Sequence, residues 1–128
     1  MTINQIDVVE VKLDGTVYHL RPGREAAFNL SQLYGGIVNL QRRLLAQDLR
    51  AYVDIVLAGT GELDPLLAAM TVPIPLPARA EVERALYREG LTDAAGRHNS
   101  ALMTAIDRFV AALVAGGRDV APPADGEA

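Results

Sequence analysis

Residues Val9–Leu20 read VEVKLDGTVYHL, and this stretch decides how the fold begins. Two short runs of alternating apolar and polar residues flank Asp14-Gly15, a pair typical of a two-residue type I′ turn, in which both central residues need a positive φ. The stretch therefore predicts an antiparallel hairpin with these cross-strand pairs: Leu13 with Thr16, Lys12 with Val17, Val11 with Tyr18, Glu10 with His19 and Val9 with Leu20.

One face of this hairpin is apolar, because strand side chains alternate between faces. The residues on that face are Val9, Val11, Leu13, Tyr18 and Leu20. An isolated hairpin is marginally stable in water, so the apolar face needs a cover. The helical sequence that follows is the candidate for that cover.

Helical spacing of apolar residues dominates the chain behind the hairpin. It predicts helices over residues 24–34, 37–46, 49–58, 66–70, 77–89 and 101–115. Asp48 is a candidate N-cap for the third of these helices, and Asn99 or Ser100 for the last. Gly35-Gly36 and Gly59-Thr60-Gly61 are interpreted as helix ends.

Three prolines at every second position interrupt this helical pattern within residues 72–77. They predict an extended connector, which is the most probable boundary inside the fold. Residues 118–128 hold few side chains to bury, so we predict a disordered tail there. The predicted fold class is α+β, mainly α: one domain over residues 1–117, with an N-terminal β-hairpin packed on a small bundle of about four to five helices.

Composition limits the function classes. Half of the 128 residues are hydrophobic, but aromatics are only 5% and Trp is absent, which favours a core of Leu, Val, Ile and Ala. The net charge of −4 argues against nucleic-acid binding, since that binding depends on neutralising phosphates. The chain has no Cys, no signal-peptide pattern at its start and no apolar run long enough for a membrane helix. These features predict a cytoplasmic protein.

No constellation of residues points to catalysis, a metal or a cofactor, so we expect a protein that is not an enzyme. His19 and His98 are isolated, whereas a zinc site needs several ligands at close spacing. The carboxylates, Asp54 among them, are scattered along the chain. Arg42-Arg43 and Arg50 form a small basic cluster. It is either a solvated helix face, a contact for an acidic partner or, less readily, a nucleic-acid contact.

The last predicted helix offers the clearest candidate for a partner surface. Its apolar stripe is wide, which is typical of a buried core helix and also of a helix that faces both its own core and a partner. The candidate partner-binding residues are Leu102, Met103, Ile106, Phe109, Val110 and Leu113 on this helix, and Val72, Ile74 and Leu76 in the Pro-rich connector.

The first half of the chain resembles a known family. The resemblance rests on VEVKLDGTVYHLR at residues 9–21, on Leu33-Tyr34-Gly35-Gly36, on Leu40…Arg43-Leu44 and on Asp48…Ile55-Val56-Leu57-Ala58-Gly59. This order of strand, Asp-Gly turn, strand, helix with an aromatic-Gly end and further helices resembles the small tail-assembly chaperones of gene transfer agents and siphophages, some of which are labelled tail tube proteins. The similarity covers residues 9–61.

The resemblance implies a chaperone that coats the hydrophobic tape-measure protein until the tail tube assembles. Its partners would be the tape-measure protein and possibly the tail tube protein, in a bacterial host, and it would act as a homo-oligomer. A structural tail component is the alternative, although a tube subunit usually needs more strands than this one hairpin. A small DNA-binding helical domain is a weaker alternative, because Gln47-Asp48 is a poor helix-turn-helix turn.

Overall fold

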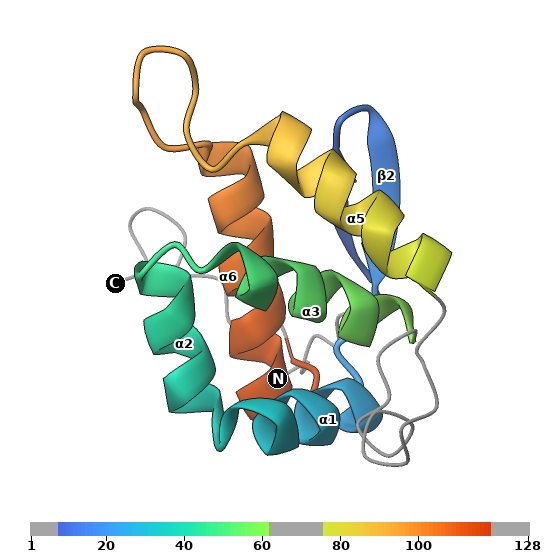
Figure 1. Ribbon diagram of the computed structural model, residues 1–128. Helices are drawn as coiled ribbons and strands as arrows, with labels where there is room; N and C mark the ends of the chain where they lie inside the picture. The colour runs from blue at the N-terminus through green and yellow to red at the C-terminus, as the bar shows by residue number, and fades with distance from the viewer. Residues whose placement is uncertain (1–7, 62–75, 119–128) are drawn as a thin grey trace.

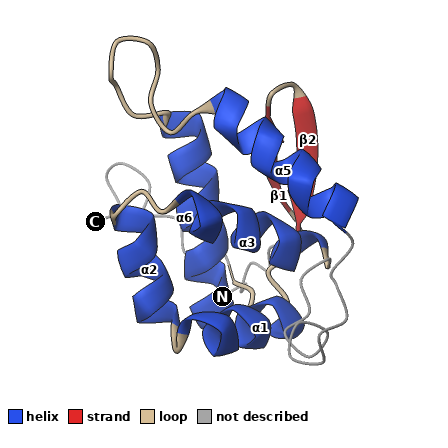
Figure 2. Cartoon of the chain, viewed as in Figure 1, coloured by secondary structure: helices blue, strands red, loops and turns tan. Residues whose placement is uncertain are grey.

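The computed structural model describes residues 8–61 and 76–118, with only the backbone for residues 76–78. It shows an N-terminal two-stranded antiparallel sheet followed by helices, which confirms the predicted α+β, mainly α class (Figure 1; Figure 2). The described elements are β1 (Val9–Leu13), β2 (Thr16–Leu20), α1 (Arg24–Tyr34), α2 (Ile37–Leu45), α3 (Leu49–Thr60), α5 (Leu76–Glu89) and α6 (Ser100–Val114).

The hairpin has the predicted register in all of its cross-strand pairs, from Leu13 with Thr16 at the turn to Val9 with Leu20 at the open end. Asp14 and Gly15 have φ values of 50° and 84°, as a type I′ turn requires. Along β1 the apolar residues are buried and the polar ones exposed. The apolar face of the hairpin packs on α3, α5 and α6, so the predicted cover is confirmed.

Helix α3 lies at the centre of the molecule and contacts α1, α2, α5 and β2 (Figure 1). Every residue from Ala51 to Gly59 is buried. Helical spacing predicts a single apolar stripe on this helix, formed by Leu49, Tyr52, Val53, Val56 and Leu57, and this prediction is too narrow. It was also wrong for Leu49, which is 46% exposed. A helix that is apolar on all sides is suited to a central position, because each of its faces meets another element.

Helix α3 continues two residues beyond its predicted end at residue 58, to Thr60, and the predicted Gly59-Thr60-Gly61 helix end is confirmed only at Gly61. A Cβ atom on Gly59 would lie 2.6 Å from the Leu20 Cβ atom. Glycine at this position therefore lets β2 approach the helix closely, and the Arg21 N–H donates to the Gly59 carbonyl at 2.9 Å. Gly61, with a φ of 88°, provides the left-handed C-cap.

Other helix boundaries follow local signals. Helix α1 has the predicted bounds, and α2 ends one residue early, at Leu45. The Asp48 side chain accepts a hydrogen bond from the Arg50 N–H at 3.0 Å, and Asn99 caps α6 through the Leu102 N–H at 3.3 Å. Both predicted N-caps are confirmed. Helix α6 starts and ends one residue earlier than predicted.

The predicted connector over residues 72–77 was wrong at its end, since Leu76 and Pro77 belong to α5. Proline fits the first turn of a helix, where its missing N–H has no helical partner to lose. The rest of the connector, the short helix over residues 66–70 and the tail beyond Arg118 lie outside the described residues. None of the helices in residues 8–61 and 76–118 combines the length and the apolar character needed to cross a membrane.

One carboxylate connects the hairpin turn to the end of α5 and the start of α6. Glu89, the last residue of α5, accepts a hydrogen bond from the Asp14 N–H at 2.9 Å and another from the Asn99 side chain at 3.0 Å. Arg88 adds an ion pair to Asp14 at 3.7 Å. These bonds join the turn, the end of α5 and the start of α6.

Candidate functional site

A groove of about 780 Å³ lies between α2 and α6, and we call it the α2–α6 groove. Its lining side chains come mainly from these two helices, with one from α3 beneath them. They are Gln41, Leu44, Leu45, Gln47, Tyr52, His98, Ser100, Met103, Thr104, Asp107, Val110 and Ala111. Asp107 is the only Asp, Glu, Lys or Arg among them, so the groove is largely uncharged.

The groove contains a fixed aromatic side chain. Tyr52 is 2% exposed, and its hydroxyl donates to the Leu44 carbonyl at 3.2 Å and approaches the Met103 sulfur at 3.4 Å. Burial, together with the nearby charge of Asp107, raises the pKa of Tyr52. The tyrosine is therefore a buried, neutral side chain that supports the groove from below, with its hydroxyl beside the thioether of Met103.

The wall of the groove on α2 carries the most exposed large apolar side chain of the described residues. Leu45 is 86% exposed, whereas Leu44 beside it is 8% exposed. Helical spacing predicts an apolar stripe of Ile37, Leu40, Leu44 and Leu45 on α2. This prediction is wrong for Leu45, because only Leu40 and Leu44 are buried on this helix. Opposite, Asp107 of α6 is exposed, yet partial desolvation by its neighbours raises the pKa of its carboxyl group.

The structure divides the candidate partner-binding residues into groups. Most of those on α6 are core residues, with exposures of 7% or less, and a partner cannot reach them without a rearrangement: Leu102, Ile106, Phe109, Val110 and Leu113. Val110 nevertheless lines one side of the groove, and the half-buried Met103 does so too. Val72 and Ile74 lie outside the described residues, and Leu76 begins α5.

Sequence reasoning missed Leu45, Tyr52 and Asp107 as members of one site. They come from three helices, and none of them stands out by its spacing. The one available signal was the pair Leu44-Leu45, since two adjacent apolar residues on a helix cannot both face the same direction.

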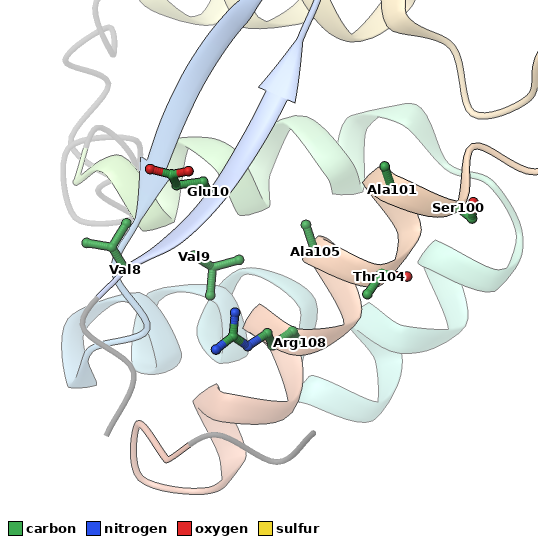
Figure 3. Close-up of a pocket in the computed structure, with 8 residues that line it drawn as sticks. All are labelled: Val8, Val9, Glu10, Ser100, Ala101, Thr104, Ala105 and Arg108. Carbon is green, nitrogen blue, oxygen red and sulfur yellow. The ribbon is translucent and has the colours of Figure 1, made fainter. Parts of the chain in front are cut away.

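A second hollow, of about 670 Å³, lies between β1 and α6 (Figure 3). In this view Ala105 projects from α6 toward the hairpin and the Arg108 side chain extends toward Val9. The lining consists of Val8, Val9, Glu10, Ser100, Ala101, Thr104, Ala105 and Arg108. Small side chains with one acidic and one basic group define no particular chemistry, so we favour the α2–α6 groove as the candidate site.

One buried polar cluster stands apart from both hollows. Asp54 of α3, 3% exposed, pairs with the Arg79 guanidinium at 2.7 Å and accepts a hydrogen bond from the Tyr34 hydroxyl at 2.5 Å. Burial and the hydrogen bond to Asp54 raise the pKa of Tyr34. The three side chains come from α3, α5 and α1, so the cluster joins these helices, and we interpret it as structural.

The structure separates the two histidines. His19 on β2 faces Glu10 at 3.7 Å across the exposed side of the hairpin, while His98 lines the α2–α6 groove. Within residues 8–61 and 76–118, no three His, Cys, Asp or Glu side chains gather in a way that could hold a metal ion.

Comparisons with models of protein families, with curated proteins and with solved structures find no match for this chain. The function is therefore argued from the groove and from the sequence pattern.

Proposed function

We propose that this chain is a phage-like tail-assembly chaperone of a bacterial host, which acts in the cytoplasm and binds the tape-measure protein. In this proposal an apolar helical segment of the tape-measure protein lies in the α2–α6 groove. The observation that carries the proposal is the groove itself, in which the exposed Leu45 stands beside Tyr52 and Met103.

The geometry suits a partner helix. A groove between two helices is a common seat for an amphipathic helix, which inserts residues spaced by three and four positions. Methionine adapts its shape to different apolar side chains, so Met103 favours a groove that accepts many related segments. A long tape-measure protein would offer such segments repeatedly.

The energetics suit a chaperone. An exposed leucine costs little while the groove is empty, and its burial by a partner contributes about 1.5–3 kcal/mol to binding. A protein that binds only the unassembled, apolar form of its partner lowers the amount of that form available for aggregation by mass action. No reactive side chain is needed for this activity. The sequence resemblance over residues 9–61 supports the same function.

Co-expression with the tape-measure protein of the same source tests the proposal. We expect the tape-measure protein to remain soluble and to co-elute with this chain. The mass of the complex measured by light scattering should correspond to several copies of this chain for each tape-measure protein. Leu45→Glu should abolish co-elution, because it places a charge in the groove. Tyr87→Glu is the matched control, since Tyr87 is 78% exposed on α5 and does not line the groove.

Two outcomes would contradict the proposal. One is precipitation of the tape-measure protein in the presence of the wild-type chain. The other is equal co-elution with the wild type and with Leu45→Glu, which would place the contact elsewhere on the surface.

A further inference from the structure

A third hollow, of about 600 Å³, gathers the basic cluster of the sequence in one place. We call it the arginine pocket. It lies where α1, α2 and α3 meet, and its lining residues are Leu33, Tyr34, Asn39, Arg42, Arg43, Asp48, Arg50 and Asp54. Three guanidinium groups thus surround one small hollow on a chain whose net charge is −4.

The two carboxylates of the arginine pocket already have partners. Asp48 caps α3 through the Arg50 N–H and pairs with Arg43 at 3.8 Å. Asp54 is neutralised by Arg79 at 2.7 Å and hydrogen-bonded by Tyr34. Neither carboxylate forms an ion pair with the two remaining arginines of the pocket, Arg42 and Arg50.

Arg42 and Arg50 are exposed, and neither forms an ion pair with any carboxylate of the described residues. A guanidinium group binds a carboxylate through two parallel hydrogen bonds, and this geometry is stronger than a single contact. Two such groups at one hollow can hold one or two carboxylates. Leu33, 42% exposed, adds an apolar contact beside them.

We propose that the arginine pocket binds an acidic segment of a protein partner through Arg42 and Arg50. A peptide carboxylate fits better than a nucleic acid. Nucleic-acid binding needs many cations along an extended path, whereas these arginines are confined to one hollow of an acidic chain.

This site is separate from the α2–α6 groove, although both use α2. At about 100° per residue, Arg43 points away from the side of α2 that carries Gln41 and Leu45, and Arg42 lies between the two sides; the two hollows share no lining residue. One helix thus presents an apolar side to one hollow and a basic side to another. The acidic segment can bind whether or not the groove binds a tape-measure protein, so each proposal can fail alone.

A titration of the isotope-labelled chain with a hexaglutamate peptide at low salt tests the proposal by nuclear magnetic resonance. We expect chemical-shift changes at Arg42 and Arg50 and at their neighbours in the pocket. The double variant Arg42→Gln/Arg50→Gln should weaken binding by about tenfold, the loss expected for two charge-assisted contacts at an exposed site. The matched control is Arg24→Gln/Arg84→Gln, which changes the net charge equally and should alter the affinity less than twofold, as an exposed substitution outside the site does.

Two results would overturn the proposal. Equal weakening by both double variants would show that the peptide responds only to the overall charge. Tighter binding of a hexathymidylate oligonucleotide at the same residues would assign the pocket to nucleic acid. Leu45→Ala, which shortens the exposed side chain of the groove without adding a charge near Arg42, should leave hexaglutamate binding unchanged, and this separates the test from that of the groove.

Discussion

Helices α2 and α3 are neighbours in the sequence but occupy opposite environments. Nine consecutive residues of α3, from Ala51 to Gly59, are buried. On α2 only Leu40 and Leu44 are buried, while Val38 and Leu45 are 61% and 86% exposed. The difference indicates that residues 51–59 of α3 contribute mainly to the stability of the fold, whereas the exposed side chains of α2, together with Arg50 at the start of α3, are available for recognition.

This division has a physical basis. A central helix contributes to stability through every face, since its side chains all leave water. A peripheral helix needs only one buried stripe, so its other faces are free to carry the apolar wall of the α2–α6 groove and the basic wall of the arginine pocket. Substitutions on the two helices should therefore separate stability from binding.

The largest expected difference in stability is between two alanine variants, one at a leucine of α3 and one at a leucine of α2. Leu57→Ala on α3 removes a fully buried side chain and leaves a cavity, so we expect a loss of about 3 kcal/mol in the free energy of unfolding. Leu45→Ala on α2 should change it by less than about 0.5 kcal/mol, because the side chain is 86% exposed. Urea denaturation of both variants checks this, and equal losses would break the comparison.

The second-largest expected loss of stability comes from breaking the buried ion pair between Asp54 of α3 and Arg79 of α5. Asp54→Ala leaves the Tyr34 hydroxyl without its acceptor and leaves the partly exposed Arg79 only its longer ion pair with Glu83, at 3.9 Å. We expect a loss of about 2–3 kcal/mol, somewhat below the usual range for a fully buried pair because Arg79 retains some contact with water. Tyr34→Phe, which removes only the hydrogen bond, should cost about 1 kcal/mol by the same thermal or urea unfolding. A larger loss for Tyr34→Phe than for Asp54→Ala would contradict this account.

A third test concerns the close approach of β2 to α3. Gly59→Ala places a Cβ atom 2.6 Å from the Leu20 Cβ atom, and both elements must move. Overpacking of this kind costs about 1–3 kcal/mol. Gly23→Ala is the comparison, since its Cβ atom would meet nothing within 4 Å. Gly23 is the N-cap of α1, so we expect only the loss of a glycine N-cap, about 0.5–1 kcal/mol. If both variants melt alike, the contact with Leu20 is not a constraint.

The smallest expected effect on stability comes from Asp107 of α6, which lines the α2–α6 groove with Tyr52 of α3. Desolvation raises the pKa of Asp107 above its ordinary value near 3.8, so the folded chain holds its proton more tightly than the unfolded chain. Stability from this group is present below pH 3.8 and is lost as the pH rises through the folded pKa. Asp107→Asn should therefore be slightly more stable than the wild type at neutral pH.

Calorimetry from pH 3 to 7, together with a carbon-13 titration of the Asp107 carboxyl group, measures this effect. A midpoint at or below the ordinary value would contradict the desolvation. Binding of a partner that places a Lys or Arg beside Asp107 should lower the midpoint, and binding of a purely apolar partner should raise it further. The titration thus also reports the chemistry of the occupant.

Much of the candidate site was beyond prediction. The basic cluster of Arg42, Arg43 and Arg50 was visible in the sequence, yet its meeting around one hollow depends on the packing of α2 against α3. Of the predicted partner-binding residues, Met103 and Val110 line the groove, while Phe109 and its apolar neighbours on α6 form the core. Periodicity marks which residues share a face, but it does not say which face remains uncovered.

The sequence by itself determined the features that depend on near neighbours in the chain. The Asp14-Gly15 turn set the register of the hairpin, and the Asp48 and Asn99 side chains set helix starts, because the bonded groups lie within a few residues of each other.

Only the tertiary structure decided the rest. It buried α3 from Ala51 to Gly59 and left Leu45 exposed beside the buried Leu44. It also joined Asp54 to Arg79 across 25 positions of the chain. Each of these outcomes depends on which helix or strand packs against which. Helical or strand periodicity cannot predict this packing, because it gives the direction of a side chain and not the identity of its neighbour.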